Sequence, residues 1–319
     1  KVWFIPFVWL GMTLYSFING LLFQALIFLT LSLLFILSLF YAAVILNRRF
    51  GLYEPPAITI SRGVYAPRTG FLGRLGFSTV EAALIRKDLK AFTRRRELMF
   101  IFVVPIVVIL VPLLQSMGAT APTGVFLYLF ALVFLMPSAI MAVSLGNIVI
   151  GEEGGAVWRI YASPISAKSL VKSKYFFVVF FSVLATAVTG TVGAAVFHPS
   201  VRAVLSGMIE SLLLVFALGA VSLANGIKGA DFTELPRPRM IRTAWGFINA
   251  IICFLAALAI LAPIMAYGLA RIIPFVSIKP LIDLYQAIVI SAIIAIIIAF
   301  VGYKIAVKNA RELLTKAEV

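Results

Sequence analysis

The chain has 319 residues, of which 63% are hydrophobic, and it carries a formal net charge of +15 at pH 7. Soluble domains are nearer to half apolar, so this composition indicates an integral membrane protein with many helical spans rather than a nucleic-acid-binding protein. Long continuous apolar runs favour an all-α fold over a barrel, whose strands alternate apolar and polar residues. One cysteine, Cys253, and one histidine, His198, cannot build a disulfide or a metal site without other partners.

Two apolar runs, at residues 2–17 and 21–46, begin the chain, and we expect two transmembrane helices there. The second run ends FYAAVILNRRFG, and the last apolar run of the chain ends in a similar way, FVGYKIAVKNARELL. Both endings combine an interfacial tyrosine, an asparagine and basic residues. This echo, and a first residue that is not Met, lead us to interpret residues 1–46 as the last two helices of a preceding six-helix half whose amino-terminal part is missing.

Residues 47–78 differ from their surroundings, because prolines, glycines and arginines replace the apolar runs. We interpret them as a cytoplasmic linker. Residues 79–98 are predicted to form an amphipathic helix, with Ser78 and Glu81 spaced as a capping box. Its apolar residues recur at helical spacing, namely Ala82, Ile85, Leu89 and Phe92. Such a basic helix is expected to lie in the headgroup layer and to orient the span that follows. The alternative is an ordinary juxtamembrane basic segment.

Six further apolar runs are each long enough to cross a hydrocarbon core of roughly 30 Å. They lie at residues 99–117, 123–149, 175–197, 203–226, 244–270 and 284–305. If residues 47–98, 151–174, 227–243 and the C-terminal tail share one side, that side collects almost every Lys and Arg, with Arg202, Arg271 and Lys279 as the exceptions. The positive-inside rule makes this side cytoplasmic. We therefore predict a multi-pass protein of the cell membrane with about eight transmembrane helices.

A polar segment at residues 151–175, GEEGGAVWRIYASPISAKSLVKSKY, separates two of these spans. Glu152 and Glu153 lie where a span ends, and two glycines then break the helix. Trp158 is an aromatic residue of the kind found at membrane interfaces, and Pro164 suits the first position of a new helix. We interpret the segment as a surface for another protein. A solvated loop with a lipid-facing tryptophan is the alternative.

A second polar loop, KGADFTELPRPRMIRT at residues 228–243, returns to the same side. Asp231 and Glu234 precede two Pro-Arg pairs. The acids could cap a short helix, and the prolines would then force an extended stretch. By itself a basic loop after a span requires no special role.

Motifs for enzymatic chemistry are absent from the sequence. It contains no GxxxxGK[ST] phosphate loop, no HExxH, no CxxC and no GxSxG. We therefore predict that the chain is not itself an enzyme and holds no cofactor or metal. One acid, Glu210, lies inside an apolar run, and the preceding run contains Thr186 and Thr189. These residues fit a polar translocation path, but they also fit close helix packing, with Glu210 paired to Arg202 or to another helix.

Three motifs resemble the type-2 permeases of ATP-binding-cassette exporters. They are IRKDLKAFTRRRELMFIFVVPIVV at residues 85–108, EEGGAVWRIYASPISAKSLVKSKY at 152–175 and ADFTELPRPRM at 230–240. They are similar to that family's elbow helix, to its coupling loop and to its loop after the fourth span. The resemblance covers residues 79–319 and implies a six-helix permease half with an elbow helix at 79–98. One departure is the short loop at residues 271–283, where some members carry re-entrant helices or larger domains.

The resemblance implies a translocation path that is moved by a separate ATPase subunit, which holds ATP and Mg. Contacts with that subunit are then expected at Glu152, Glu153, Trp158, Pro164, Ile165, Asp231, Phe232 and Arg237. Candidate path residues are Thr186, Thr189 and Glu210. The other expected partners are the lipid bilayer and a second permease half, from the same chain or from another copy. An ion-coupled secondary transporter that uses Glu210 is the alternative, and a structural membrane subunit is a third possibility.

Overall fold

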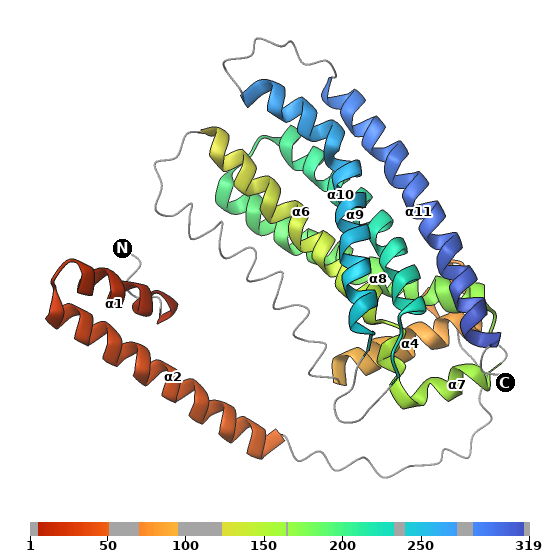
Figure 1. Ribbon diagram of the computed structural model, residues 1–319, viewed down its shortest axis with the longest axis horizontal. Helices are drawn as coiled ribbons and strands as arrows, with labels where there is room; N and C mark the ends of the chain where they lie inside the picture. The colour runs from red at the N-terminus through yellow and green to blue at the C-terminus, as the bar shows by residue number, and fades with distance from the viewer. Residues whose placement is uncertain are drawn as a thin grey trace. The chain divides into compact units, whose positions relative to one another are not determined.

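The computed structural model describes residues 6–50, 70–94, 123–163, 165–232, 240–272 and 283–315. Within these ranges the chain forms helices joined by turns, and the one strand-like pairing is an isolated bridge between Ala230 and Ile241. The chain divides into two compact units, Lys1–Tyr65 and Ala66–Val319 (Figure 1). The prediction of an all-α membrane protein is confirmed.

The first unit contains a helical hairpin. A 3₁₀ turn, η1 (Pro6–Val8), leads into α1 (Trp9–Ile18), and α2 (Leu22–Phe50) runs back beside it (Figure 1). Gly20 has φ 72° in the turn, a left-handed conformation that glycine adopts without strain. The expected break after the first apolar run is therefore the turn of this hairpin.

The two helices of the hairpin differ in length. α2 is a candidate span over Leu22–Ile45. The helix α1 has 10 residues, about half of the roughly 20 that a spanning helix needs. The expected span at residues 2–17 stays a prediction, because residues 1–5 lie outside the described part of the chain.

The second unit is a bundle of long helices with shorter helices at one end (Figure 1). Its long helices are α6 (Thr123–Ile148), α8 (Ala167–Phe197), α9 (Val201–Lys228), α10 (Thr243–Ile272) and α11 (Leu284–Thr315). Its short elements are α3 (Phe71–Arg74), α4 (Thr79–Arg94), η2 (Gly151–Val157) and α7 (Trp158–Tyr161).

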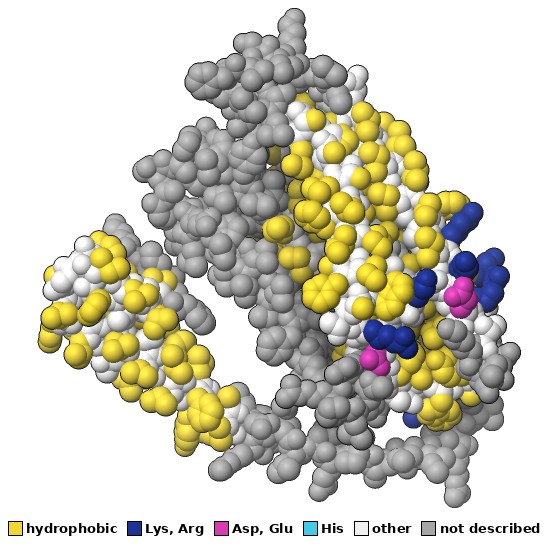
Figure 2. All heavy atoms as spheres, in the orientation of Figure 1, with side chains coloured by type: hydrophobic (Ala, Val, Ile, Leu, Met, Phe, Trp, Pro, Cys, Tyr) yellow, Lys and Arg dark blue, Asp and Glu magenta, His cyan; other side chains and the backbone are white. Residues whose placement is uncertain are grey.

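Six helices of the described chain are long and apolar enough to cross a membrane, and five of them belong to the second unit. Side chains such as Phe247, Phe254 and Phe300 are well exposed on α10 and α11. Figure 2 shows hydrophobic side chains over much of the visible face of this bundle. Such a surface suits contact with lipid rather than with water. The span expected at residues 99–117 lies outside the described residues.

Helix α9 lies at the centre of the bundle and packs against α6, α8, α10 and α11. Glycines permit the closest approaches. A Cβ atom at Gly226 would meet the carbonyl oxygen of Gly146 at 2.5 Å, and one at Gly302 of α11 would meet the backbone nitrogen of Val221 at 2.9 Å. Close backbone contact of this kind is what small residues provide between membrane helices, where lipid weakens the hydrophobic force for association.

An apolar cluster joins the short elements to the bundle. Its members come from six separate elements, for example Leu84 of α4, Ile160 of α7, Leu170 of α8 and Ile227 of α9. Figure 2 shows Lys and Arg side chains gathered toward this end. Among the described residues of the second unit, α4, α7 and the C-terminal end of α9 thus lie together at one end.

Helix α8 begins earlier than the sequence suggested. The apolar run was expected from residue 175, but the helix starts at Ala167, and the Ser166 side chain caps it by accepting from the Ser169 backbone at 3.1 Å. Lys168, Lys172 and Lys174 therefore lie on the first turns of the helix rather than in a loop. Hydropathy misses this start because lysine lowers the apolar average while favouring helix formation.

We expect Gly226→Ala to destabilise the bundle, because the added methyl group would press on two backbone carbonyls of α6. Overpacking of this kind typically costs about 1–3 kcal/mol. The thermal midpoint of the purified protein in detergent would fall accordingly. Gly246→Ala is the matched control, because nothing lies within 4 Å of a Cβ there, and its midpoint should stay unchanged or rise slightly. Equal midpoints for the two variants would contradict the close approach of α9 to α6.

Candidate functional site

The α6–α8 connection, residues Gly151–Tyr161, forms two short helical turns rather than a loop. Gly154 breaks the first of them, with φ 50° and ψ −138°, a conformation that side chains other than glycine rarely adopt. The break lies inside η2, and it separates Glu152 and Glu153 from α7, which carries Trp158. The predicted helix break at the glycine pair is thus present, at its first member.

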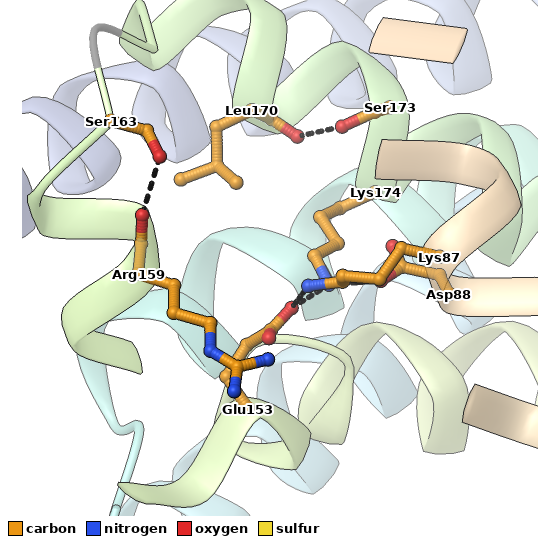
Figure 3. A network of polar contacts seen from close by, with 8 residues as sticks. All are labelled: Lys87, Asp88, Glu153, Arg159, Ser163, Leu170, Ser173 and Lys174. Carbon is orange, nitrogen blue, oxygen red and sulfur yellow. Dashed lines mark hydrogen bonds and ion pairs between the residues drawn. The ribbon is translucent and has the colours of Figure 1, made fainter. Parts of the chain in front are cut away.

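Helix α7 presents one face outward and one inward. Trp158 is 60% exposed, whereas Ile160 is buried in the apolar cluster. The Arg159 guanidinium lies over the Trp158 ring, 5.6 Å from its centroid. The Ser163 hydroxyl donates to the Arg159 carbonyl at 2.5 Å and so closes the turn after α7 (Figure 3). An aromatic ring and a cation are thereby held together at the surface.

An ion-pair cluster, defined here as Lys87, Asp88, Glu153 and Lys174, lies close to α7; Lys87 is exposed, and the other three are largely buried (Figure 3). The Lys174 Nζ atom is 2.9 Å from the Asp88 carboxylate and 2.7 Å from the Glu153 carboxylate. The exposed fraction is 1% for the Lys174 side chain, 3% for Asp88 and 10% for Glu153. Lys87 of α4 also pairs with Glu153. The cluster therefore joins α4, the α6–α8 connection and α8.

A second ion pair fixes the start of α4. The Ser78 backbone donates to the Glu81 carboxylate at 2.9 Å, and the Glu81 backbone donates to the Ser78 hydroxyl at 3.3 Å, which confirms the capping box. The Lys172 ammonium donates to the same carboxylate at 2.9 Å and to the Gly76 carbonyl at 2.8 Å. The beginning of α4 is thereby attached to α8.

The two polar loops meet at the backbone. A Cβ atom at Gly151 would overlap the carbonyl oxygen of Met240, in the loop between α9 and α10. In that loop the Asp231 backbone donates to the Met240 carbonyl at 3.3 Å, and the Arg242 backbone donates to the Gly229 carbonyl at 2.9 Å. The two regions that we expected to contact another protein therefore touch each other at Gly151 and Met240.

The expected contact residues occupy different environments in this surface. Trp158 is exposed, whereas Ile165 and Phe232 are half-buried against the apolar cluster and Asp231 is half-buried in the second loop. Glu152 is buried, and Glu153 is held in the ion-pair cluster. These two acids therefore have little surface left for a partner, and their geometry suits a structural role instead. Pro164 and Arg237 lie outside the described residues.

Sequence reasoning missed Asp88, Lys174 and Arg159. A signal for Asp88 was present, because it lies three residues after Ile85 and so on the apolar stripe of α4. A charged residue on the buried face of a helix requires a partner from elsewhere in the chain. Lys174 offered no such signal, because three lysines precede or begin the apolar run and the sequence does not distinguish the buried one.

The expected path residues lie within the bundle. Thr186 and Thr189 of α8 are buried, and their hydroxyls donate to carbonyls of their own helix, Ser182 at 2.8 Å and Thr186 at 3.3 Å. Glu210 of α9 is 1% exposed, and neither of its carboxyl oxygens has a hydrogen-bond partner among the described residues. Its expected pairing with Arg202 is not among the ion pairs of the described chain. No group of three potential metal ligands occurs in those residues either.

The Glu81 pair predicts a pH dependence of stability. Burial acts against the charged carboxylate, but hydrogen bonds from the Ser78 backbone and Lys172 outweigh it and hold the pKa of Glu81 below its ordinary value of 4.5. A depressed pKa in the folded state gives stability that is fully present above the ordinary value and is lost as pH falls through the lowered one. We expect the thermal midpoint to fall over this acidic range, and Glu81→Gln to lower it at neutral pH while flattening the acid dependence. Glu312→Gln, at an exposed acid of α11, should change neither; equal slopes for all three proteins would contradict the role of Glu81.

Comparison with known proteins identifies a family for the middle of the chain. The family described as "ABC-2 family transporter protein" matches residues 83–230, which run from α4 to the bridge at the end of α9. This range contains the exposed Trp158 and the whole ion-pair cluster. No curated protein and no solved structure matches the chain. This match over residues 83–230 supports an ABC-2 type permease.

Proposed function

We propose that this chain is the transmembrane subunit of an ATP-binding-cassette exporter and that it couples a translocation path to ATP hydrolysis by a separate ATPase subunit. The observation that carries the proposal is the surface formed by the α6–α8 connection and the loop between α9 and α10. Trp158 and Arg159 are exposed on it, its two parts touch at Gly151 and Met240, and the ion-pair cluster attaches it to α4 and α8. A rigid polar and aromatic surface at the end of membrane helices is suited to receive force from a partner.

The chemistry of the surface favours a particular mode of docking. Trp and Arg are the residue types most often found at the energetic centre of protein interfaces. Trp158 would enter an apolar cleft of the ATPase, and Arg159 would face carboxylates at the rim of that cleft. Glu152 and Glu153 would support this contact from beneath, while Pro164 and Arg237 stay predicted contacts. ATP and Mg would be held by the partner, since the sequence has no phosphate loop.

The membrane arrangement extends the proposal. The end that carries Trp158 would be cytoplasmic, because the basic residues gather there. ATP-driven movement of the ATPase would tilt α6 and α8, which flank the α6–α8 connection, and alternate access to a path between two permease halves. The second half would come from another copy or from the same chain. Thr186, Thr189 and Glu210 are the candidate path residues.

Replacement of Trp158 tests the docking surface. We expect Trp158→Ala to weaken binding of the ATPase subunit by about 2 kcal/mol or more, as at other interface centres, or roughly 30-fold. Co-purification from membranes, followed by titration of the purified ATPase subunit, measures this. Tyr285→Ala is the control, because Tyr285 is also an exposed aromatic residue (74%) but lies at the N-terminal end of α11, outside the proposed docking surface. If the native chain captured no ATPase, or if both variants bound as the native chain does, the proposal would fail.

An ion-coupled secondary transporter is the second candidate, and Glu210 is the observation that favours it. Its carboxyl group is buried within a candidate span, and its oxygens have no hydrogen-bond partner in the described residues. Intramembrane acids commonly take part in ion or proton pathways. Against this candidate, the five long helices of the second unit are continuous over their described lengths, whereas such transporters commonly use interrupted helices.

Proton flux separates the two candidates. For the exporter, proteoliposomes that contain the chain alone should show no more proton flux than empty vesicles when a pH gradient is imposed. An ion-coupled transporter would move protons, and Glu210→Gln would reduce the flux to the level of empty vesicles, because an amide does not exchange a proton in this range. A pH-sensitive dye inside the vesicles measures the flux, and Glu312→Gln serves as the control. Flux that depends on Glu210 would reject the exporter in favour of the second candidate.

A further inference from the structure

The ion-pair cluster connects segments that are far apart in the sequence through one buried cation. The Lys174 ammonium has a carboxylate of α4 on one side, at 2.9 Å, and a carboxylate of η2 on the other, at 2.7 Å. Lys174 belongs to α8, so three elements meet at a single nitrogen atom (Figure 3). Lys87 adds a second link between α4 and Glu153. The two lysines and two carboxylates balance in formal charge.

Net stabilisation does not by itself explain such a cluster. Removing charges from water is costly, and well-packed apolar side chains of similar volume are often as stabilising as a buried ion pair. An apolar contact, however, tolerates sliding, whereas ion pairs at 2.7 and 2.9 Å hold only in a narrow geometry. The cluster is therefore better suited to fixing the relative position of α4 and η2 than to adding stability alone.

The position of the cluster links it to the exposed surface. Glu153 lies five residues before Trp158, with only the Gly154 break and the end of η2 between them. On the other side of α7, Ile160 packs into the same apolar cluster as Leu84 and Leu89 of α4. The α6–α8 connection is thus attached to α4 through the ion-pair cluster, and α7 and α4 both contribute side chains to the same apolar cluster.

We infer that Lys174 is a positioning residue that fastens the α6–α8 connection to α4, so that Trp158 and α4 move as one body. One part of this inference rests on the proposed function: a force that a partner applies at Trp158 would reach α4 as well as α8. A partner that pushed on Trp158 would then displace the amphipathic helix before the first span of the second unit, in addition to the two helices that flank the connection. The fastening itself is a property of the chain alone.

Spin-label distances test the fastening in the purified chain in lipid nanodiscs. Labels at Ala83→Cys on α4 and Ala162→Cys after α7 occupy exposed positions, in a Cys253→Ser background. We expect a single narrow distance distribution in this reference protein. Two variants should broaden it. Glu153→Met cuts the link to the connection while leaving Lys174 paired with Asp88. Lys174→Met/Asp88→Asn/Glu153→Gln removes the three buried charges together, and Lys87, which loses its partners, is exposed enough to be hydrated.

The controls keep each outcome decisive. Lys168→Met removes an exposed lysine from the same helix and should leave the distribution unchanged. Because the two test variants disturb the fold in different ways, either one that remains monodisperse decides the result. A distribution as narrow in either monodisperse variant as in the reference protein would overturn the inference.

A second measurement follows the consequence. With the co-purified ATPase subunit, the distance between the two labels should be the same without nucleotide and with ATP trapped by vanadate. A shift of about one helical turn, roughly 5.4 Å, would overturn the inference while leaving the proposed function intact. If no ATPase co-purifies, the proposed function fails, and the nanodisc measurement still decides whether Lys174 fastens the connection.

Discussion

One end of this helical bundle depends on the ion pairs of a buried ammonium group. Lys174 is 1% exposed, and it has two carboxylates from different segments in place of water. A buried charge without such partners is strongly destabilising, so the chain adopts this geometry only when α4, the α6–α8 connection and α8 meet. Trp158 lies on the same connection as Glu153, on the other side of the Gly154 break.

Packing inside the bundle follows a different physical rule from packing at its end. Lipid is as apolar as leucine, so helices gain little by hiding apolar side chains from it, and close backbone contact with hydrogen bonding takes over. Gly226 and Gly302 bring α6 and α11 onto α9, and the Asn309 side chain donates to the Ala224 carbonyl at 2.8 Å. Helix α9 leads directly into the loop whose Met240 touches Gly151. The polar surface and the tightly packed centre of the bundle are thus continuous.

The sequence predicted those features that depend on short stretches of chain. The lengths of the apolar runs predicted the ends of α6, α9, α10 and α11 to within a few residues, except that α11 continues to Thr315. Local spacing predicted the Ser78–Glu81 capping box. Features that depend on pairing across the chain were not predicted. The burial of Lys174 requires Asp88, 86 residues away, and Glu153 appeared available for a partner because its own partners lie elsewhere in the sequence.

The two acids emphasised by the sequence, Glu153 and Glu210, have opposite surroundings, and this separates their roles. Glu153 pairs with two lysines, so a change of its charge would break contacts between three elements. Its role is to hold these elements in one relative position. Glu210 is equally hidden but has no hydrogen-bond partner in the described residues, so no such geometry depends on it. An unsatisfied carboxyl group in a membrane helix is costly, and it becomes less so when water, a proton or another helix reaches it. The energetic cost of Glu210 therefore depends on what reaches it, whereas Glu153 already has its partners within the chain.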